Sequence, residues 1–244
     1  MKEYFADLHV HTALSPCADR EMTPRSIVDV ALLRGLSMIA ICDHNAAHNV
    51  AAVQAVAGSR LCVLAGMEIT TTEEVHMVGL FPDVHAAAAA AAEFAENLPL
   101  IPPERKGQEA QVVFAEDGEP ASFETRMLSS TSGLELNAAI DLIKRHHGLA
   151  VAAHVDRPSF GIYGQLGFFP ADAGFDAIEV TAHLARSLWA RQIDQLSLPV
   201  LSSSDAHFLA ELGKSRTRLW SREPNFNELV LAVRGQGGRE CRRA

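Results

Sequence analysis

The sequence predicts an α/β protein in which short strands assemble into a parallel sheet or barrel. Apolar runs of β type alternate with helical patterns along most of the chain, which is typical of such folds. The chain has 244 residues and is 48% hydrophobic, enough for one sizeable core and for a single α/β barrel. No apolar run reaches about 18 residues, so we expect no membrane-spanning segment.

The first predicted elements are a strand at 4–10 (YFADLHV) and a helix at 23–35. The helix is indicated by its two ends. Thr23 is a capping residue, Pro24 occupies the first helical position, and Gly35 can end the helix.

The next predicted elements are a strand at 37–44 (SMIAICDH) and a helix at 49–58 (NVAAVQAVAG). Apolar runs at 60–70 and 73–81 predict two more strands. The alanine-rich stretch at 85–98 predicts a helix, because alanine loses no side-chain entropy on ordering.

Residues 99–134 interrupt this rhythm and are interpreted as an insertion within one domain. The stretch QVVFAEDGEPASF contains the Asp117-Gly118 pair between two β-prone runs, which predicts a hairpin. We expect a single barrel domain over 1–236 and a flexible basic tail at 237–244.

The alternation resumes after the insertion. The sequence predicts helices at 134–148, 183–196 and 225–235 and strands at 149–154, 176–180 and 198–207.

Histidines and carboxylates gather at the ends of these predicted strands. Because strand side chains alternate between two faces, His9 and His11 should point to one side while Leu8 and Val10 point to the other. The remaining residues of this kind are His44, Glu68, His76, His154, Asp205 and His207.

A lone histidine at a strand end is usually a hydrogen-bonded rim or core residue. A whole set at the rim where parallel strands end is better explained as a metal cluster. Imidazoles and carboxylates together are the ligands of zinc, manganese and iron sites.

These residues belong to motifs that resemble those of the PHP (polymerase and histidinol phosphatase) superfamily. The matching stretches are, in chain order, DLHVHT, DH at 43–44, GME at 66–68, EEVHMVGLF, AAHVDR and SSSDAH. The resemblance covers most of residues 5–210. It implies a distorted (β/α)7 TIM-like barrel of the PHP type and a site for two to three divalent metals, with phosphate ester hydrolysis as the usual activity.

Carried over by position, the resemblance implies ligands for three metal ions. The first would be held by His9, His11, Glu68 and Asp205, the second by Glu68, His76 and His154, and the third by His44, His207 and an acidic residue of the loop after the first strand.

The third site departs from the common family pattern. Many relatives have Ser-Asp-Gly soon after the H-x-H stretch, whereas SPCADRE follows here. Asp19 is the candidate for the missing ligand. Cys17 is its rival, unless it is a plain loop cysteine.

Such an arrangement suits phosphate ester hydrolysis. Two divalent metals about 3.5–4 Å apart can share a hydroxide that attacks in line with the leaving oxygen. Glu68 suits the bridge between them, and Glu68 and Asp205 are the expected catalytic carboxylates. The metal itself is expected to be zinc, manganese or iron.

Two further residues are candidates for contacts with substrate. Arg157 can hold a phosphate oxygen or form a surface ion pair. His183 can act as a general acid or phosphate ligand, or serve only to pack a helix start. Glu179 can orient a ligand or merely end its strand.

The charge balance bears on the partner. The chain has 21 Lys and Arg against 30 Asp and Glu, a net charge of −9, which disfavours long nucleic acid as a general partner. We expect a small phosphorylated metabolite, a nucleotide or a short oligonucleotide end as substrate. The alternatives are a barrel metallohydrolase acting on a non-phosphate bond and a non-catalytic metal-binding PHP module. The start MKEYFADLH and four cysteines without C-x-x-C spacing favour a cytoplasmic protein.

Overall fold

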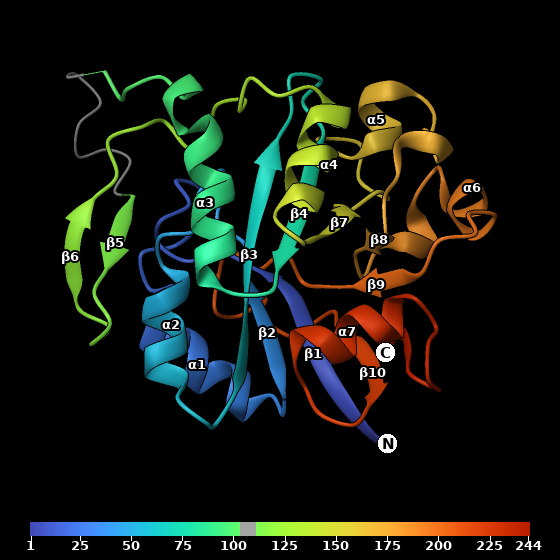
Figure 1. Ribbon diagram of the computed structural model, residues 1–244, viewed down its shortest axis with the longest axis horizontal. Coiled ribbons are helices and arrows are strands. Elements are labelled where there is room, and N and C mark those ends of the chain that lie inside the picture. The colour runs from blue at the N-terminus through green and yellow to red at the C-terminus, as the bar shows by residue number, and fades with distance from the viewer. Residues whose placement is uncertain (103–110) are drawn as a thin grey trace.

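A computed structural model describes residues 1–102 and 111–244, and within them one large sheet curves into a nearly closed barrel (Figure 1). The strands of this sheet are β1 (Lys2–Val10), β2 (Met38–Ile41), β3 (Cys62–Thr70), β4 (His76–Phe81), β7 (Leu149–Ala152), β8 (Ala177–Val180), β9 (Val200–Ser202), β10 (Thr217–Ser221) and β11 (Glu240–Arg243). Their order is β11-β10-β1-β2-β3-β4-β7-β8-β9. A parallel bridge between Val10 and Ala206 joins the end of β1 to the segment after β9.

The sheet is mixed, whereas the sequence predicted a parallel one. Strand β4 runs antiparallel to both β3 and β7, and His76 at its start pairs with Thr70 at the end of β3. The physical reason is the short connection at 71–75, because a parallel crossover needs a dozen or more residues. The reversal brings the beginning of β4 to the rim where β3 ends.

Seven α-helices surround the sheet in the described residues. They are α1 (Pro24–Leu33), α2 (Val50–Ala57), α3 (Val84–Phe94), α4 (Leu136–Arg145), α5 (Ile162–Leu166), α6 (Ala190–Asp194) and α7 (Phe226–Val233). The predicted cap of α1 is confirmed, since the Thr23 side chain accepts a hydrogen bond from the Ser26 amide and Pro24 opens the helix. None of the helices in the described part of the chain is long and apolar enough to cross a membrane.

Two apolar clusters hold the sheet and its helices together. Helices α1 to α4 pack on the outer face with residues such as Val10, Ile39 and Met67. Leu8 belongs instead to an inner cluster with Leu149 of β7 and residues of α7. Strands β9 and β10, near opposite ends of the order, also contribute to this inner cluster, as expected for a sheet that curves on itself.

The expectation that Leu8 and Val10 face the same side is wrong. They lie in different clusters because the β1–β2 register shifts between Asp7 and Val10, which breaks the strict alternation of side chains.

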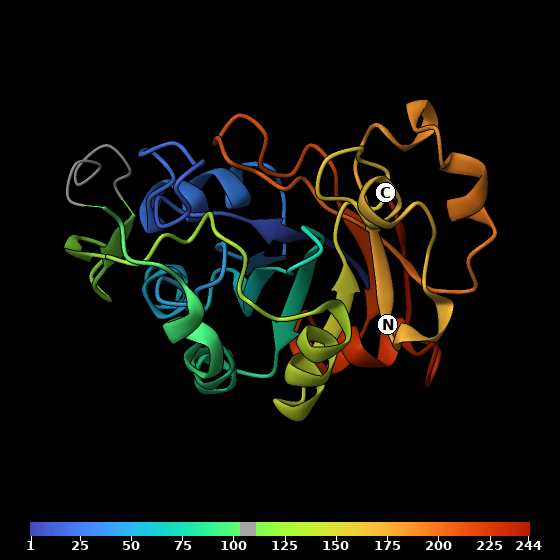
Figure 2. The ribbon, with the colours of Figure 1, turned by 90° about the horizontal axis from the view of Figure 1, so that it is seen from above.

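The predicted hairpin is confirmed in the insertion, although residues 103–110 of that insertion lie outside the described residues. Strands β5 (Val112–Phe114) and β6 (Pro120–Phe123) pair antiparallel. Figure 2 shows this hairpin at one edge of the molecule, while α6 lies at the opposite edge. The side chain of Asn49 fixes the hairpin, donating to the Val112 carbonyl at 2.8 Å and accepting from the Phe114 amide at 2.9 Å.

The segment 183–196, predicted as one helix, is broken. A 3-10 turn at Leu184–Arg186 precedes α6, and Ser187 between them is extended. The Ser187 hydroxyl accepts a hydrogen bond from the Trp189 amide, and the Trp189 ring stacks on Tyr163 with 6.0 Å between centroids. Local capping and tertiary stacking therefore override the helical pattern.

The C-terminal residues 237–244 also differ from the expected flexible tail. Residues Glu240–Arg243 form β11 on the edge of β10, and Cys241 packs against the inner cluster. Arg239, directly before β11, fixes this segment through an ion pair with Glu228 of α7 at 2.8 Å. Strands β10 and β11 escaped the sequence analysis because each is short and gains its stability from pairing.

We predict that Asn49→Ala loosens the hairpin. Asn49 is fully buried and its side chain does not cap α2, so the variant leaves the polar groups of Val112 and Phe114 without their partner. The expected loss is about 1–3 kcal/mol of unfolding free energy. Urea denaturation measures this loss. Hydrogen exchange should show faster exchange of the amides over 111–123. Asn227→Ala, at an exposed position of α7, is the matched control, and equal effects in both variants would contradict the prediction.

Candidate metal centre

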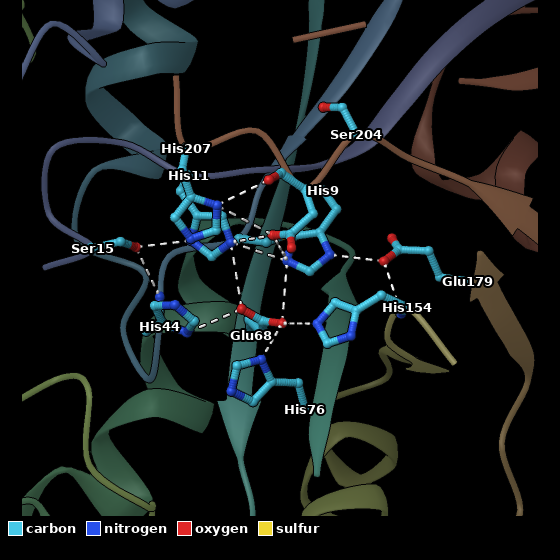
Figure 3. Close-up of polar contacts among 12 residues, drawn as sticks. His9, His11, Ser15, His44, Glu68, His76, His154, Glu179, Ser204 and His207 are labelled. Carbon is cyan, nitrogen blue, oxygen red and sulfur yellow. Dashed lines mark hydrogen bonds and ion pairs between the residues drawn. The ribbon is translucent and has the colours of Figure 1, made fainter. Parts of the chain in front are cut away.

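Eight of the predicted ligand residues gather at one rim of the barrel, and Figure 3 labels all of them except Asp205. They come from the ends of β1, β2, β3, β7 and β9 and from the start of β4: His9, His11, His44, Glu68, His76, His154, Asp205 and His207. All are buried except His207, which is half-buried. Asp19 is the one predicted ligand outside this cluster.

Glu68 lies at the centre of the cluster. Its Oε1 atom is 2.9 Å from His76 Nδ1 and 3.1 Å from His154 Nε2. Its Oε2 atom is 3.0 Å from His44 Nδ1 and 3.4 Å from His11 Nε2. The two carboxylate oxygens therefore face different sets of imidazoles, so each could serve a different group of ligands.

A second carboxylate, Asp205, completes a group of four with His9, His11 and Glu68. Asp205 Oδ1 is 3.0 Å from His11 Nε2 and 3.4 Å from His9 Nε2. The two Nε2 atoms are only 3.1 Å apart. Four potential ligand atoms thus converge on one point.

The hydrogen bonds behind these rings fix their tautomers. His9 Nδ1 donates a hydrogen bond to a Glu179 oxygen at 3.0 Å. His11 Nδ1 donates to the Ser15 hydroxyl at 2.9 Å, since that hydroxyl itself donates to Asp43 at 2.7 Å. A single proton on each Nδ1 leaves both Nε2 atoms with lone pairs that face each other. This arrangement needs a proton or a cation between the two nitrogens, and a metal ion fits there.

The electrostatics of the cluster favour cations. Burial alone would raise the pKa of Glu68, but His76, His9 and His44 hold it well below its usual value. Burial likewise opposes the charge on Asp205, and His9 and His11 lower the pKa of that carboxyl. Burial would lower the pKa of His44, yet Glu68 and Cys17 raise it to about 10. Both carboxylates therefore stay ionised and need positive charge around them.

Two more sets of ligand atoms adjoin the first. His44, Glu68 and His76 form one set, and His11, His44 and His207 form another. His154 reaches the same Glu68 oxygen as His76. Its Nδ1 atom is buried and has no hydrogen-bond partner among the described residues. Such an orphaned polar atom is costly in an interior and calls for an explanation such as a bound ion.

The two rivals for the third site are placed differently. Asp19 is half-buried and its carboxylate accepts a hydrogen bond from the Glu21 amide at 2.8 Å. The Cys17 sulfur lies 3.2 Å from His44 Nε2. Burial would raise the pKa of Cys17, but hydrogen bonds with His207 and His44 lower it to about 6. The side chain of Cys17 thus contacts an imidazole of the cluster, whereas the carboxylate of Asp19 is engaged within its own turn.

Arg157 and His183 lie beside the cluster, in a shared pocket. The Arg157 guanidinium pairs with the second oxygen of Asp205 while its side chain stays 40% exposed. It lines a pocket of about 300 Å³ together with His183, Arg186 and Trp189. The His183 amide donates to the Thr181 hydroxyl, so the residue is held at the pocket wall.

Several rim residues have positive φ angles. His154, Asp205 and Phe160 have φ of 27°, 51° and 57°, in the region that favours glycine. The Phe160 ring stacks on His76 with 4.4 Å between centroids. Backbone strain of this kind clusters at functional sites, where the surrounding structure maintains it.

Sequence reasoning missed the support that Ser15 gives, whereas Asp43 was already a candidate to hydrogen-bond a ligand histidine and does so through Ser15. Asp43 accepts hydrogen bonds from the Thr12 amide and hydroxyl and from Ser15, which in turn holds His11. The available clue for Ser15 was that it closely follows the H-x-H stretch. Glu179 orients His9, the first of the two roles considered for it.

Comparison with protein families identifies the class. The PHP domain model matches residues 7–190, and the PHP-associated model matches residues 184–236. The chain therefore belongs to the PHP family, and the resemblance drawn from its motifs is confirmed.

Matches to individual proteins are consistent with membership of this family. The uncharacterized protein YqxK of Bacillus subtilis (strain 168) is 30% identical over 99 residues, covering 38% of this chain and 25% of YqxK. The lesion-specific endonuclease PfuEndoQ from Pyrococcus furiosus has a TM-score of 0.72 at 19% identity, over 98% of this chain and 58% of that one. Endonuclease Q in complex with a 27-mer duplex carrying an abasic lesion gives 0.69 at 20% identity, with the same coverage of both chains.

A solved structure of similar size is a candidate metal-dependent phosphoesterase from Bifidobacterium adolescentis. Its TM-score is 0.57 at 20% identity, over 93% of this chain and 96% of that one. The chain thus spans only a quarter of YqxK and 58% of endonuclease Q. Likeness at these identities establishes the fold, and the expected PHP-type barrel is confirmed.

We predict that Glu179→Ala weakens metal binding by about 10–100-fold, the range typical of a residue that orients a metal-ligating histidine. Glu179 accepts hydrogen bonds from His9 Nδ1 and from the His154 amide, so its loss removes a hydrogen bond from two members of the cluster. Competition for zinc with a chromophoric chelator measures the affinity.

Glu179→Gln keeps an acceptor oxygen and should lose less affinity. Glu119→Ala, at an exposed hairpin position, should lose none. Unchanged zinc affinity in Glu179→Ala would contradict a supporting role.

Proposed function

We propose that this PHP protein is a metal-dependent phosphoesterase. One observation carries the proposal: Glu68 is in contact with five imidazoles and shares two of them with Asp205. Family membership supports it, as does the likeness to a candidate phosphoesterase and to endonuclease Q.

The donor set suits two to three divalent ions such as zinc, manganese or iron. His9, His11, Glu68 and Asp205 would hold one ion, and Glu68 with His76 and His154 a second. A pair of divalent ions supplies Lewis acidity, which makes water nucleophilic near neutral pH and offsets charge on the phosphate oxygens.

Arg157 is proposed to bind the phosphate group. Its guanidinium is held by Asp205 at the edge of the cluster, and its exposed part leaves donors for an incoming oxygen. A planar guanidinium can bind two phosphate oxygens at once. Because Asp205 is also a proposed metal ligand, its ion pair with Arg157 would place the phosphate next to the metal ions.

His183 is proposed to protonate the leaving oxygen. Its side chain lines the same pocket as Arg157, so a substrate held by the arginine would extend past the imidazole. Imidazole is suited to this task because its ordinary pKa lies near neutrality.

The pocket also supports a substrate class. Besides His183 it carries Arg157, Arg186 and the Trp189 ring, and its volume is about 300 Å³. Arginines favour phosphate, and an aromatic wall favours a flat ring. We therefore propose a small phosphorylated molecule, with nucleotides as the first candidates.

DNA is a second candidate, against the sequence-based expectation that long nucleic acid is not a general partner. The fold of endonuclease Q matches 98% of this chain, and endonuclease Q has been solved with a lesion-bearing duplex. The net charge of −9 opposes broad electrostatic attraction to DNA. Nucleoside monophosphates, 5′-phosphorylated oligonucleotides and an abasic duplex, assayed in parallel, separate the candidates.

We predict that the purified protein carries two to three divalent metals per chain, and that EDTA abolishes phosphate release from esters. Adding zinc or manganese should restore activity. Elemental analysis and a colorimetric phosphate assay measure both. Less than one metal per chain in freshly purified protein would count against the proposal.

Glu68→Gln serves as the variant for this experiment because it removes the negative charge at the centre of the cluster without changing size. Turnover should fall to background, while thermal unfolding stays cooperative. Glu135→Gln, at an exposed position at the start of α4, is the control and should keep full activity. Substantial turnover by Glu68→Gln would exclude a bridging role.

We predict that Arg157→Ala lowers kcat/KM by about 10–100-fold, since a hydrogen bond to a charged group contributes about 1.5–3 kcal/mol. Arg157→Lys should lose less because it keeps the charge but not the planar pair of donors. Steady-state kinetics on the best ester measures both. A decrease confined to metal content, with kcat/KM per bound metal unchanged, would mean that Arg157 only supports Asp205.

A further inference from the structure

The loop between β1 and α1 holds one cysteine against the histidine cluster. Backbone contacts fix this loop on both sides of Cys17. The His44 amide donates to the Ser15 hydroxyl at 3.1 Å, and the Asp19 amide donates to the His207 carbonyl at 2.8 Å. These two hydrogen bonds hold Cys17, midway between Ser15 and Asp19, between the segments that carry His44 and His207.

The side chains of Cys17 and His207 are also oriented towards the cluster. The Cys17 sulfur lies 3.2 Å from His44 Nε2, and the loop that carries it is tied to His207 through the Asp19 amide. His207 Nδ1 donates to the Asp205 carbonyl at 2.9 Å, which leaves the lone pair of Nε2 free to bind. The sulfur and His44 Nε2 therefore lie side by side at the mouth of the cluster, and His44 and His207 belong to one group of potential ligands.

Asp19 is engaged elsewhere. Its carboxylate accepts from the Glu21 amide within its own turn, and its amide is fixed to His207. A carboxylate at this position would have to break that turn to reach the imidazoles.

We propose that Cys17 provides a thiolate ligand which, with His44 and His207, holds a third cation and makes that position selective for thiophilic metals. Thiolate and imidazole ligands suit zinc, cobalt and iron, whereas magnesium and manganese prefer oxygen. The sulfur would thus distinguish this position from the oxygen-rich position at Glu68 and Asp205. The inference rests on the proposed function only in that the same cluster binds metal.

Cobalt(II) is the probe, because it substitutes for zinc and reports its ligands spectroscopically. Any tightly bound cobalt gives visible d–d absorption, whereas only a thiolate ligand adds a charge-transfer band in the near-ultraviolet. Titrating the metal-free full chain with cobalt should produce both signals. Cys17→Ser should abolish the charge-transfer band and bind one cobalt fewer per chain, while keeping the d–d absorption of the other positions.

Asp19→Asn and Cys62→Ser are the controls and should retain the band and the full cobalt content. A wild-type spectrum with d–d absorption but no charge-transfer band would overturn the role of Cys17 and leave the phosphoesterase proposal intact. Persistence of the band in Cys17→Ser, or loss of cobalt from Asp19→Asn alone, would also overturn it. If the wild-type chain binds no cobalt at all, both proposals fail.

Discussion

The buried carboxylate of Glu68 is the constraint on which the rest of the site depends. Five imidazoles surround its two oxygens at 2.9–3.5 Å, inside a rim shielded from solvent. A carboxylate buried this deeply is stable only with positive charge around it, supplied by protons or by metal ions. The imidazoles come from β1, β2, β4 and β7, so the charge of one residue couples the ends of several strands.

The barrel achieves this convergence through two departures from a regular parallel sheet. Strand β4 reverses direction and brings His76 to the rim where the parallel strands end. The register shift in β1 separates Leu8 from Val10, so that the inner apolar cluster ends where the histidines begin. Beneath the ligands, Glu179 and the Asp43–Ser15 pair hold His9 and His11 in orientations that point their free nitrogens at each other.

The same centre gives an acidic chain a place for anions. The net charge is −9, yet bound divalent ions and the adjoining Arg157 would make the rim locally positive. Opposite sides of the cluster carry different chemistry. Arg157 and the aromatic pocket adjoin Asp205, whereas the sulfur of Cys17 approaches from the loop after β1. Substrate and metal selectivity can thus be set by separate segments around one carboxylate.

The sequence by itself determined the α/β class, the alternation of most strands and helices, the insertion hairpin and the motifs of the PHP family. It did so because apolar periodicity, capping residues and ligand spacing are local properties. Only the tertiary structure decided which of Cys17 and Asp19 approaches His44, because both lie in one loop and the choice depends on contacts with distant residues. It also decided the broken helix near Trp189 and the pairing of β10 with β11, since stacking on Tyr163 and strand pairing link segments that are far apart in the chain.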